Sequence, residues 1–460
     1  MNNPQKSVHM SSTSPERISV DLTSGIVDRL QNLSVEEHSS DDGDDSKKTQ
    51  IFASVDDSDD YDDYEEEEDD DDDDEEEEDL EPVYGYHVDL IAQEHQHNCR
   101  PIYTRKLLND IKSFADRIRK ELSVAPDQRQ LQSIYAYGLN QNHYRIWQLD
   151  NNSRSNYLQV EYLSRVEMHS EFQHRFGKHS DQIKVLRKYN EDHENDCIDT
   201  PYTFITFDRQ YLNQHRDIAK MREYWAAMTH TRGLWKESSA RRKLREDFQG
   251  LAKSCAPITQ VVCFGLGALN LKKNWYHSAI QHMAVFTIIH TLNEFYRQTE
   301  PNRPATKLLL QDPNYKIKDH HILQKLTGDA NNVAFVNDPD GLLAIDAGTL
   351  VVTAYLPVQM PLVQIIADLF SEDPTQGPAA IICDIMTIDV EKRDYSWSDR
   401  SSPATARFLT NHYEKVEDGF DEHGLDDELM EDAYGNDWKE NNRFYWLNQM
   451  DLWVRKTGTD

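Results

Sequence analysis

The stretch Ile258-Thr-Gln-Val-Val-Cys-Phe-Gly-Leu-Gly267 decides the fold class of this 460-residue chain. The run up to Phe264 is apolar, rich in β-branched residues and as long as a buried strand. It stops at Gly265 and Gly267, and from Ser278 to Tyr296 apolar residues recur at three- and four-residue steps, the spacing of a helix. The sequence therefore predicts a strand, a tight glycine turn and a long helix.

Further apolar runs of strand length follow, separated by segments with helical spacing. The expected strands lie at 308–310, 333–336, 349–355 and 379–383, and the expected helices at 321–326 and 362–370. Nearly continuous apolar strands separated by helices are what a parallel sheet covered on both faces requires. We therefore expect an α/β domain with a mostly parallel sheet over residues 258–390.

Gly265 and Gly267 stand where doubly wound folds bring backbone N–H groups and a helix N-terminus to a phosphate or a nucleoside. Asp312 follows the second strand, at the place of a ribose-binding acid, although its separation from Gly267 is about twice the usual ~20 residues. Asn270 replaces the third glycine of the dinucleotide fingerprint. Two interpretations stay open: a ligand cleft formed by Gly265, Gly267 and Asp312, or a tight turn with Asp312 as its strand-end cap.

The N-terminal part of the chain divides into two regions. Residues 1–82 contain an almost uninterrupted acidic run from Asp56 to Glu81, which repels itself and buries no apolar surface, so we expect a disordered, low-complexity acidic tail. Residues 83–250 are interpreted as a mixed α+β region of unknown fold. Its expected elements are a helix at 103–122, a strand at 203–207 and a helix at 238–253.

The C-terminal part follows the α/β domain, which we place at residues 251–392. Residues 393–460 are acidic again and end in an aromatic cluster: Trp438, Phe444, Tyr445, Trp446 and Trp453. We expect an acidic linker and an aromatic C-terminal helix. Either these side chains are buried in the core and dock the terminus onto the domain, or the helix binds a partner protein.

Composition and charge exclude several classes of protein. The chain has 83 acidic and 49 basic residues and a net charge of -34, whereas a nucleic-acid binder needs a basic face. No apolar run approaches the roughly 18 residues of a membrane span, and the first residues lack the apolar core of a signal peptide. The five cysteines form no CxxC pair, as a reducing compartment favours. We therefore expect a cytoplasmic or nuclear protein that contacts neither nucleic acid nor membrane.

No motif assigns a reaction. His95, His97 and Cys99 alternate, but no second cluster at ligand spacing accompanies them, so we expect no metal site. The groups available to a reaction are acids at expected strand ends, and no His, Cys or Lys constellation accompanies them: Asp338, Asp384 and Asp389. We therefore name no catalytic residue.

A pattern of short motifs runs through the α/β domain: Val261-Val-Cys-Phe-Gly-Leu-Gly267, Gln281, Asp312-Pro313, a strand entering Tyr355-Leu-Pro357, and a last apolar strand at 380–383. This pattern resembles the sensitivity-to-red-light-reduced (SRR-like) domain family, in what looks like a fungal form. The resemblance covers about 258–390 and implies a Rossmann-like domain with regulatory roles, linked in plants to circadian timing and phytochrome signalling.

The chain departs from the family pattern at two places. Pro357-Val358-Gln359 stands where many members have Pro-His-Cys, and Cys383-Asp384 stands where many have Gly-Asn. Both departures remove polar groups from the carboxyl edge of the expected sheet, where an active site would lie, and so lower the expectation of a conserved reaction.

The favoured interpretation is a regulatory protein of the cytoplasm and nucleus that has no cofactor and acts through protein partners. Whether it is also an enzyme stays open, with the non-enzymatic interpretation preferred. The alternative is a methyltransferase-like enzyme that uses S-adenosylmethionine, in which Gly265, Gly267 and Asp312 would bind the cofactor.

Overall fold

The computed structural model describes residues 86–96, 98–125, 128–130, 133–137, 144–148, 157–169, 201–207, 220–271, 276–327, 332–358, 360–416, 420, 423–436, 438–441 and 443–457. The chain divides into two units, Met1–Asp74 and Glu75–Asp460, and every element below belongs to the second. The acidic tail expected over residues 1–82 lies outside the described residues.

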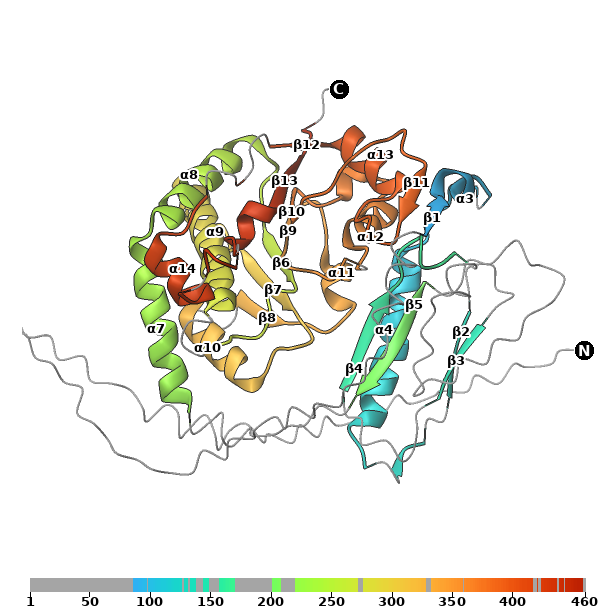
Figure 1. Cartoon of the computed structure of the whole chain (residues 1–460), viewed down its shortest axis with the longest axis horizontal. Helices are drawn as coiled ribbons and strands as arrows, with labels where there is room; N and C mark the ends of the chain where they lie inside the picture. Colours follow the sequence, from blue (N-terminus) through green and yellow to red (C-terminus); the bar gives the residue numbers. More distant parts are fainter. Residues whose placement is uncertain are drawn as a thin grey trace, which may run out of the picture. The chain divides into compact units, whose positions relative to one another are not determined.

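A seven-stranded sheet forms the centre of the second unit (Figure 1). Five strands are parallel: β6 (Gln260–Phe264), β7 (Lys307–Gln311), β8 (Val333–Phe335), β9 (Thr349–Thr353) and β10 (Ala380–Asp384). Strand β13 (Met450–Arg455) pairs antiparallel with β10, and β12 (Tyr413–Lys415) pairs antiparallel with β13. The mostly parallel α/β sheet expected from the sequence is confirmed, and all five expected strands are present.

The spatial order of the strands is β12-β13-β10-β9-β6-β7-β8. Numbered along the chain, the five parallel strands therefore stand in the order 3-2-1-4-5, with β6 first in sequence and central in space. The chain winds outward from β6 in one direction through β7 and β8, and then in the other through β9 and β10. In open parallel sheets such a reversal marks the place at the carboxyl edge where ligands bind.

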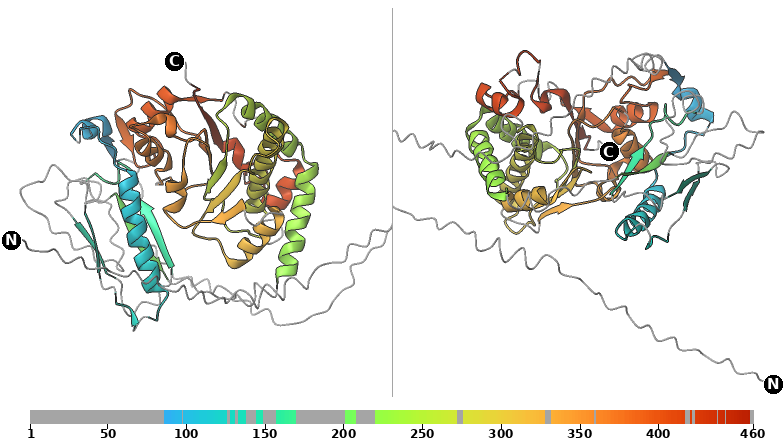
Figure 2. Two further views of the ribbon diagram at one scale, coloured as in Figure 1. Left: turned by 180° about the vertical axis from the view of Figure 1, so that it is seen from behind. Right: turned by 60° about the horizontal axis from the view of Figure 1, so that its bottom comes forward.

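Alternate residues of each central strand face opposite layers of helices. Val261 and Cys263 belong to a core cluster with α7 (Met221–Glu237), α8 (Ser239–Ser254), α9 (His277–Thr299), α10 (Ile317–Thr327) and α14 (Asp427–Tyr434). Val262 and Phe264 belong to a second cluster with α4 (Arg105–Leu122), α11 (Asp340–Ala344), α12 (Leu362–Leu369) and α13 (Pro403–His412). Figure 2 shows the two layers from behind and from below. Because both faces are covered, the strands are apolar along their whole length.

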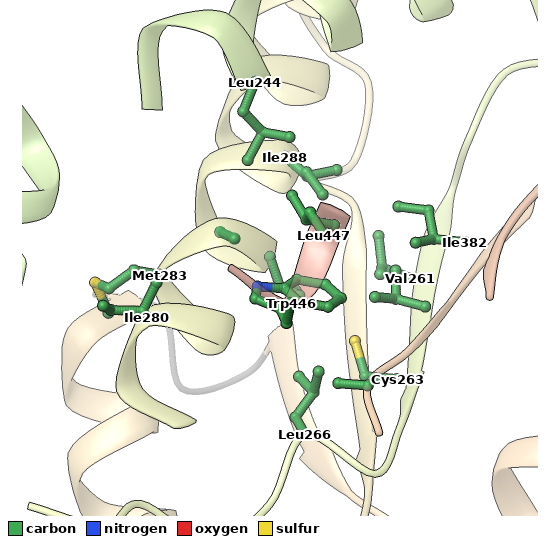
Figure 3. Packing of buried hydrophobic residues seen from close by; sticks show 14 of the residues in the cluster. Leu244, Val261, Cys263, Leu266, Ile280, Met283, Ile288, Ile382, Trp446 and Leu447 are labelled. Atoms are coloured by element: carbon green, nitrogen blue, oxygen red, sulfur yellow. The ribbon is translucent and has the colours of Figure 1, made fainter. Parts of the chain in front are cut away.

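The aromatic terminus forms a strand where we expected a helix. Trp446 begins a 3-10 helix, η5 (Trp446–Gln449), and β13 follows at once. The side chain of Trp446 is fully buried and lies among Leu244, Ile280, Met283 and Val261 of the first core cluster (Figure 3). Docking onto the domain is thus what the structure shows for this side chain, and pairing along β10 is what makes the terminus a strand.

The N-terminal region packs against the same sheet. Strand β1 (His87–Asp89) pairs antiparallel with β11 (Asp394–Ser396), and α3 (Leu90–Gln96) follows β1. Helix α4 begins at Arg105 because Thr104 Oγ1 accepts a hydrogen bond from the N–H of Leu107 at 3.2 Å. Two antiparallel pairs complete the region: β2 (Ser133–Tyr137) with β3 (Tyr144–Gln148), and β4 (Tyr157–Tyr162) with β5 (Tyr202–Phe207). The one-turn 3-10 helix η4 (Pro374–Gln376) precedes β10.

Candidate functional site

The turn after β6 needs glycine for two reasons. Gly265 and Gly267 have φ angles of +75° and +74°, in the region that side chains rarely adopt. A Cβ at Gly265 would also lie 2.6 Å from Leu356 Cδ2 and 2.9 Å from the carbonyl oxygen of Ala354. The loop that follows β9 is therefore closed over the end of β6, and the first glycine is required by packing.

Gly267 is in a more open place. Ser278 Cβ, at 3.9 Å, is the one heavy atom of the described chain within 4 Å of the position that a Cβ would take. The N–H of Gly267 donates a 2.8 Å hydrogen bond to Asp312 Oδ2, while Asp312 Oδ1 accepts a 2.7 Å hydrogen bond from the N–H of Asn314. The structure thus brings Gly267 and Asp312 together, and Asp312 holds both its own strand end and the glycine turn.

The segment between the glycine turn and α9 is fastened by a buried acid that the sequence did not single out. Asp319, in the first turn of α10, accepts hydrogen bonds from the N–H groups of Leu269 at 3.0 Å and Lys316 at 2.6 Å. Burial raises the pKa of Asp319 to about 6, although these two donors oppose the shift. No motif marks Asp319; the only sequence signal is a lone acid at the start of a short helix.

A neutral histidine supports the same segment from α9. Burial lowers the pKa of His282 to about 4, so its ring is uncharged near pH 7. Nδ1 lies 2.6 Å from the carbonyl oxygen of Ser278, and Nε2 lies 2.9 Å from the hydroxyl of Tyr315. The consistent tautomer donates from Nδ1 and accepts from Tyr315 at Nε2. Both ring nitrogens are therefore engaged: Nδ1 bonds within α9, and Nε2 joins α9 to Tyr315 in the segment after β7.

The acids at the other strand ends also form hydrogen bonds or ion pairs within the protein. Tyr162 of β4 donates a 2.6 Å hydrogen bond to Asp338 Oδ1, and burial raises the pKa of Asp338 to about 7 against the effect of that bond and of Arg119. Asp384, at the end of β10, pairs with Arg400 at 3.1 Å. Asp389 lies in the loop after β10 and accepts a 2.8 Å hydrogen bond from the N–H of Glu391.

The carboxyl edge also exposes apolar surface. The three most exposed large hydrophobic side chains of the described chain are Tyr355 at 46%, Ile385 at 52% and Phe444 at 54%. They follow β9, follow β10 and precede β13, which are neighbours in the sheet, and the hydroxyl of Tyr355 lies 3.5 Å from the carbonyl oxygen of Phe444. Tyr355 has a φ of +47°, an uncommon conformation for a bulky residue. We call these three side chains the edge patch.

Metal ions and membranes each make a clear demand on the residues that the structure describes. No group of three or more His, Cys, Asp or Glu side chains is gathered there as a metal ion would require; His95 Nδ1 and Cys99 Sγ are 3.9 Å apart, and His97 lies outside the described residues. Within the same residues, no helix combines the length and the apolar character needed to cross a membrane.

Comparison with known families identifies the domain that carries these features. Residues 240–451 match the family model of the SRR1 domain, while no curated protein matches the chain. The match extends beyond the expected 258–390 at both ends, because it includes α8 and reaches the start of β13. The resemblance drawn from the glycine turn and the strand motifs is confirmed over this part of the chain: residues 240–451 match the SRR1 domain.

Proposed function

We propose that this protein is a regulatory protein, without a reaction of its own, whose Rossmann-like SRR1 domain acts through protein partners. The strand order 3-2-1-4-5 supports the Rossmann-like assignment. The same proposal includes four further points: a family context of circadian and light-signalling regulation, a place in the cytoplasm and nucleus, a disordered acidic tail, and a fungal source. The net charge of -34 favours protein over nucleic acid as the partner.

The observation that carries the proposal is how the acidic side chains at the carboxyl edge of the sheet are bonded. Asp312 and Asp384 are engaged by groups of their own domain, and Asp338 is engaged by Tyr162. A catalytic acid has to reach a substrate, whereas these three hold loops and strand ends in place. The edge patch faces solvent at this edge, and exposed apolar surface of this kind is typical of protein contacts.

The edge patch also indicates the chemistry of its partner. Arg443 is exposed beside it, and its charge acts on Tyr355, partly opposing the rise that burial causes in the pKa of that phenol. Apolar side chains next to a cation fit a partner segment in which apolar residues adjoin a carboxylate. Aromatic anchors with a charged rim are the usual composition of such interfaces.

The proposal is tested with the full chain and a matched pair of double variants. Tyr355→Asn with Phe444→Ser removes both aromatic rings of the edge patch and places at 355 a residue that tolerates positive φ. Val390→Ser with Val416→Ser removes two exposed apolar side chains that are not part of the edge patch. Proteins captured by the wild type are purified and titrated against all three forms.

Loss of an aromatic anchor costs about 2 kcal/mol, so the edge variant should weaken the complex roughly 30-fold. The Val390 and Val416 variant should leave the affinity within about two-fold, since surface substitutions change free energies by about 0.5 kcal/mol or less. Equal affinities of the two variants would show that partners do not use the edge patch and would remove the support for this function.

The second candidate function is a methyltransferase-like enzyme that uses S-adenosylmethionine. The observation that favours it is the doubly wound strand order 3-2-1-4-5, in which ligands bind at the carboxyl edge where the order reverses, beside the turn of Gly265 and Gly267. Among the described residues only Ser278 Cβ lies within 4 Å of the place of a Cβ at Gly267, and this place, next to the carboxylate of Asp312, fits the approach of a nucleoside. This likeness is one of topology, and folds of one topology host many functions.

Calorimetric titration of the full chain with S-adenosylmethionine decides between the two candidates. Under the regulatory proposal the wild type shows no saturable heat. Under the enzyme candidate it binds with a micromolar Kd, and Asp312→Asn, which keeps the shape and removes the charge, weakens binding at least several-fold because a hydrogen bond to a charged group is worth about 1.5–3 kcal/mol. Micromolar binding that Asp312→Asn abolishes would overturn the regulatory proposal.

A further inference from the structure

Helix α7 lies at the outside of its helix layer and carries a row of cations (Figures 1 and 2). Arg222, Trp225, Arg232 and Lys236 follow one another at steps of three, seven and four residues, and this spacing keeps them on one side of a helix. The three cations are exposed, and Trp225 is half-buried against the first core cluster. The row therefore presents positive charge around an aromatic ring.

Helix α10 adds two cations to this row. Lys325 Nζ lies 4.3 Å from the centre of the Trp225 ring, and Lys318 Nζ lies 5.0 Å from the centre of the Tyr224 ring. Cations at such distances are attracted to the face of an aromatic ring, so α10 is held beside the first two turns of α7. We give the name basic face to six side chains: Arg222, Trp225, Arg232, Lys236, Lys318 and Lys325.

The charges of the basic face are not balanced by their neighbours. Over the residues that the structure describes, none of its five cations forms an ion pair with a carboxylate. Several cations on other helices are paired, such as Lys112 with Asp340 at 2.5 Å and Arg245 with Glu294 at 2.7 Å. A chain with a net charge of -34 thus has a local surface on which positive charge is uncompensated.

Helix α14 approaches α7 from another side. His230 Nε2 lies 2.8 Å from Asp432 Oδ2 of α14, and position 230 is turned by about 80–160° around α7 from the four positions of the row. The exposed acids of α7, Glu223 and Glu237, each follow a cation by one residue and are turned by about 100° from it. The row is therefore on a side of α7 that α14 does not cover, and it contains no acid.

We propose that the basic face binds an acidic segment of a protein partner, in which carboxylates alternate with apolar side chains. From Arg222 to Lys236 the row extends about 21 Å at ~1.5 Å per residue, a length that about six residues of an extended segment span at ~3.3 Å each. The guanidinium groups of Arg222 and Arg232 each offer a carboxylate two parallel hydrogen-bond donors. An apolar side chain between these contacts packs on the ring of Trp225.

The same charges disfavour a nucleic acid at this place. DNA and RNA carry negative charge along their whole length, so they extend beyond the basic face onto an otherwise acidic protein. A short acidic segment contacts the basic face alone and ends before that repulsion begins. The contact uses α7 and α10 and no residue of the edge patch, so it is additional to the proposed function and does not depend on it.

The test measures, by fluorescence anisotropy, the binding of the full chain to a labelled peptide of four Glu-Glu-Leu repeats. The control peptide has Gln in place of every Glu. The acidic peptide should bind saturably, and its affinity should fall several-fold when sodium chloride rises from about 50 to about 200 mM, because salt screens exposed charges. Absence of saturable binding, or equal binding of the two peptides, would overturn the proposal.

A matched pair of double variants locates the contact. Arg222→Gln with Arg232→Gln removes two exposed charges of the basic face and should weaken peptide binding about five-fold, as expected for the loss of two exposed ion pairs. Arg117→Gln with Lys120→Gln makes the same charge change at exposed positions of α4, in the other helix layer, and should leave the affinity within about two-fold. Equal losses in the two variants would show that the peptide responds only to overall charge, and the proposal would fail.

Two other occupants are distinguished by the same assay. An oligonucleotide of twelve thymidines that binds more tightly than the peptide, and is lost in the variant of Arg222 and Arg232, would assign the basic face to nucleic acid. A full chain in which amides replace the acids of residues 56–81 should bind the peptide as wild type does. An affinity at least about ten-fold higher would show that the chain's own acidic run competes for the face, and either result would overturn the assignment to a partner.

Discussion

Replacing Trp446 with alanine should destabilise the protein more than any single change in the aromatic terminus. A buried tryptophan removes roughly 150–250 Å² from water, which at about 25 cal/mol per Å² corresponds to ~4–6 kcal/mol. Alanine retains part of this burial and the cavity walls relax in part, so we expect Trp446→Ala to lower the free energy of unfolding by about 3–5 kcal/mol.

The same terminus offers a matched control two residues away. Phe444 is 54% exposed, so Phe444→Ala should change the free energy of unfolding by no more than about 0.5 kcal/mol. Urea unfolding of the full chain, followed by far-UV circular dichroism, measures both variants by the shift of the midpoint. Equal midpoints for Trp446→Ala and wild type would refute the packing argument, because a side chain in that core cannot be removed without loss.

Two further changes test the carboxyl edge. Gly265→Ala should lower the free energy of unfolding by at least about 2 kcal/mol, because it combines a left-handed φ with a contact against Leu356. Gly250→Ala, on α8 with no described atom within 4 Å of its new Cβ, should raise the free energy of unfolding by about 0.5–1 kcal/mol. Urea midpoints that move in the same direction for both variants would contradict this. The pKa of Asp338 is raised to about 7 from 3.8, so the folded state favours the protonated acid and its stability falls as pH rises from about 4 to about 7, above which this contribution no longer changes. Asp338→Asn lacks this dependence, and its melting temperature relative to wild type should therefore rise between pH 5 and pH 8; a constant difference would show that the acid is ionised throughout.

The sequence predicts the central strands because each is buried on both faces. An apolar run such as that of β6 is stable only in the interior of the protein, and the glycines at its end mark the turn. Strand β13 differs because Asp451 lies between apolar residues and Trp453 follows Trp446 by seven positions, a spacing that also suits a helix. What decides in favour of a strand is the open edge of β10, which pairs Ala380 with Val454 and Asp384 with Met450. The strand conformation of residues 450–455 therefore depends on the edge of β10, which the sequence of these residues alone does not indicate.

The polar contacts of the site were less predictable than the strands. The pairing of Gly267 with Asp312 follows from a known arrangement of strand ends, and the sequence suggested it. Asp319 and His282 carry no motif, because their function is to satisfy backbone groups of a loop that bends only in the folded chain. The contact between Arg165 and Asp368 joins positions 203 residues apart, and nothing local to either residue indicates the other.

The reversal of strand order between β6 and β9 is the expected place for a ligand, and here the loop after β9 occupies it. The left-handed φ of Tyr355 turns the chain so that Leu356 lies against Gly265. A ligand at this edge therefore has two places open to it: over Gly267 towards β7, or on the edge patch towards β10 and β13. The first place demands a polar, nucleoside-like molecule, and the second demands an apolar one. The two proposed functions thus require different halves of the same edge, so variants at Asp312 and at Tyr355 report on them independently.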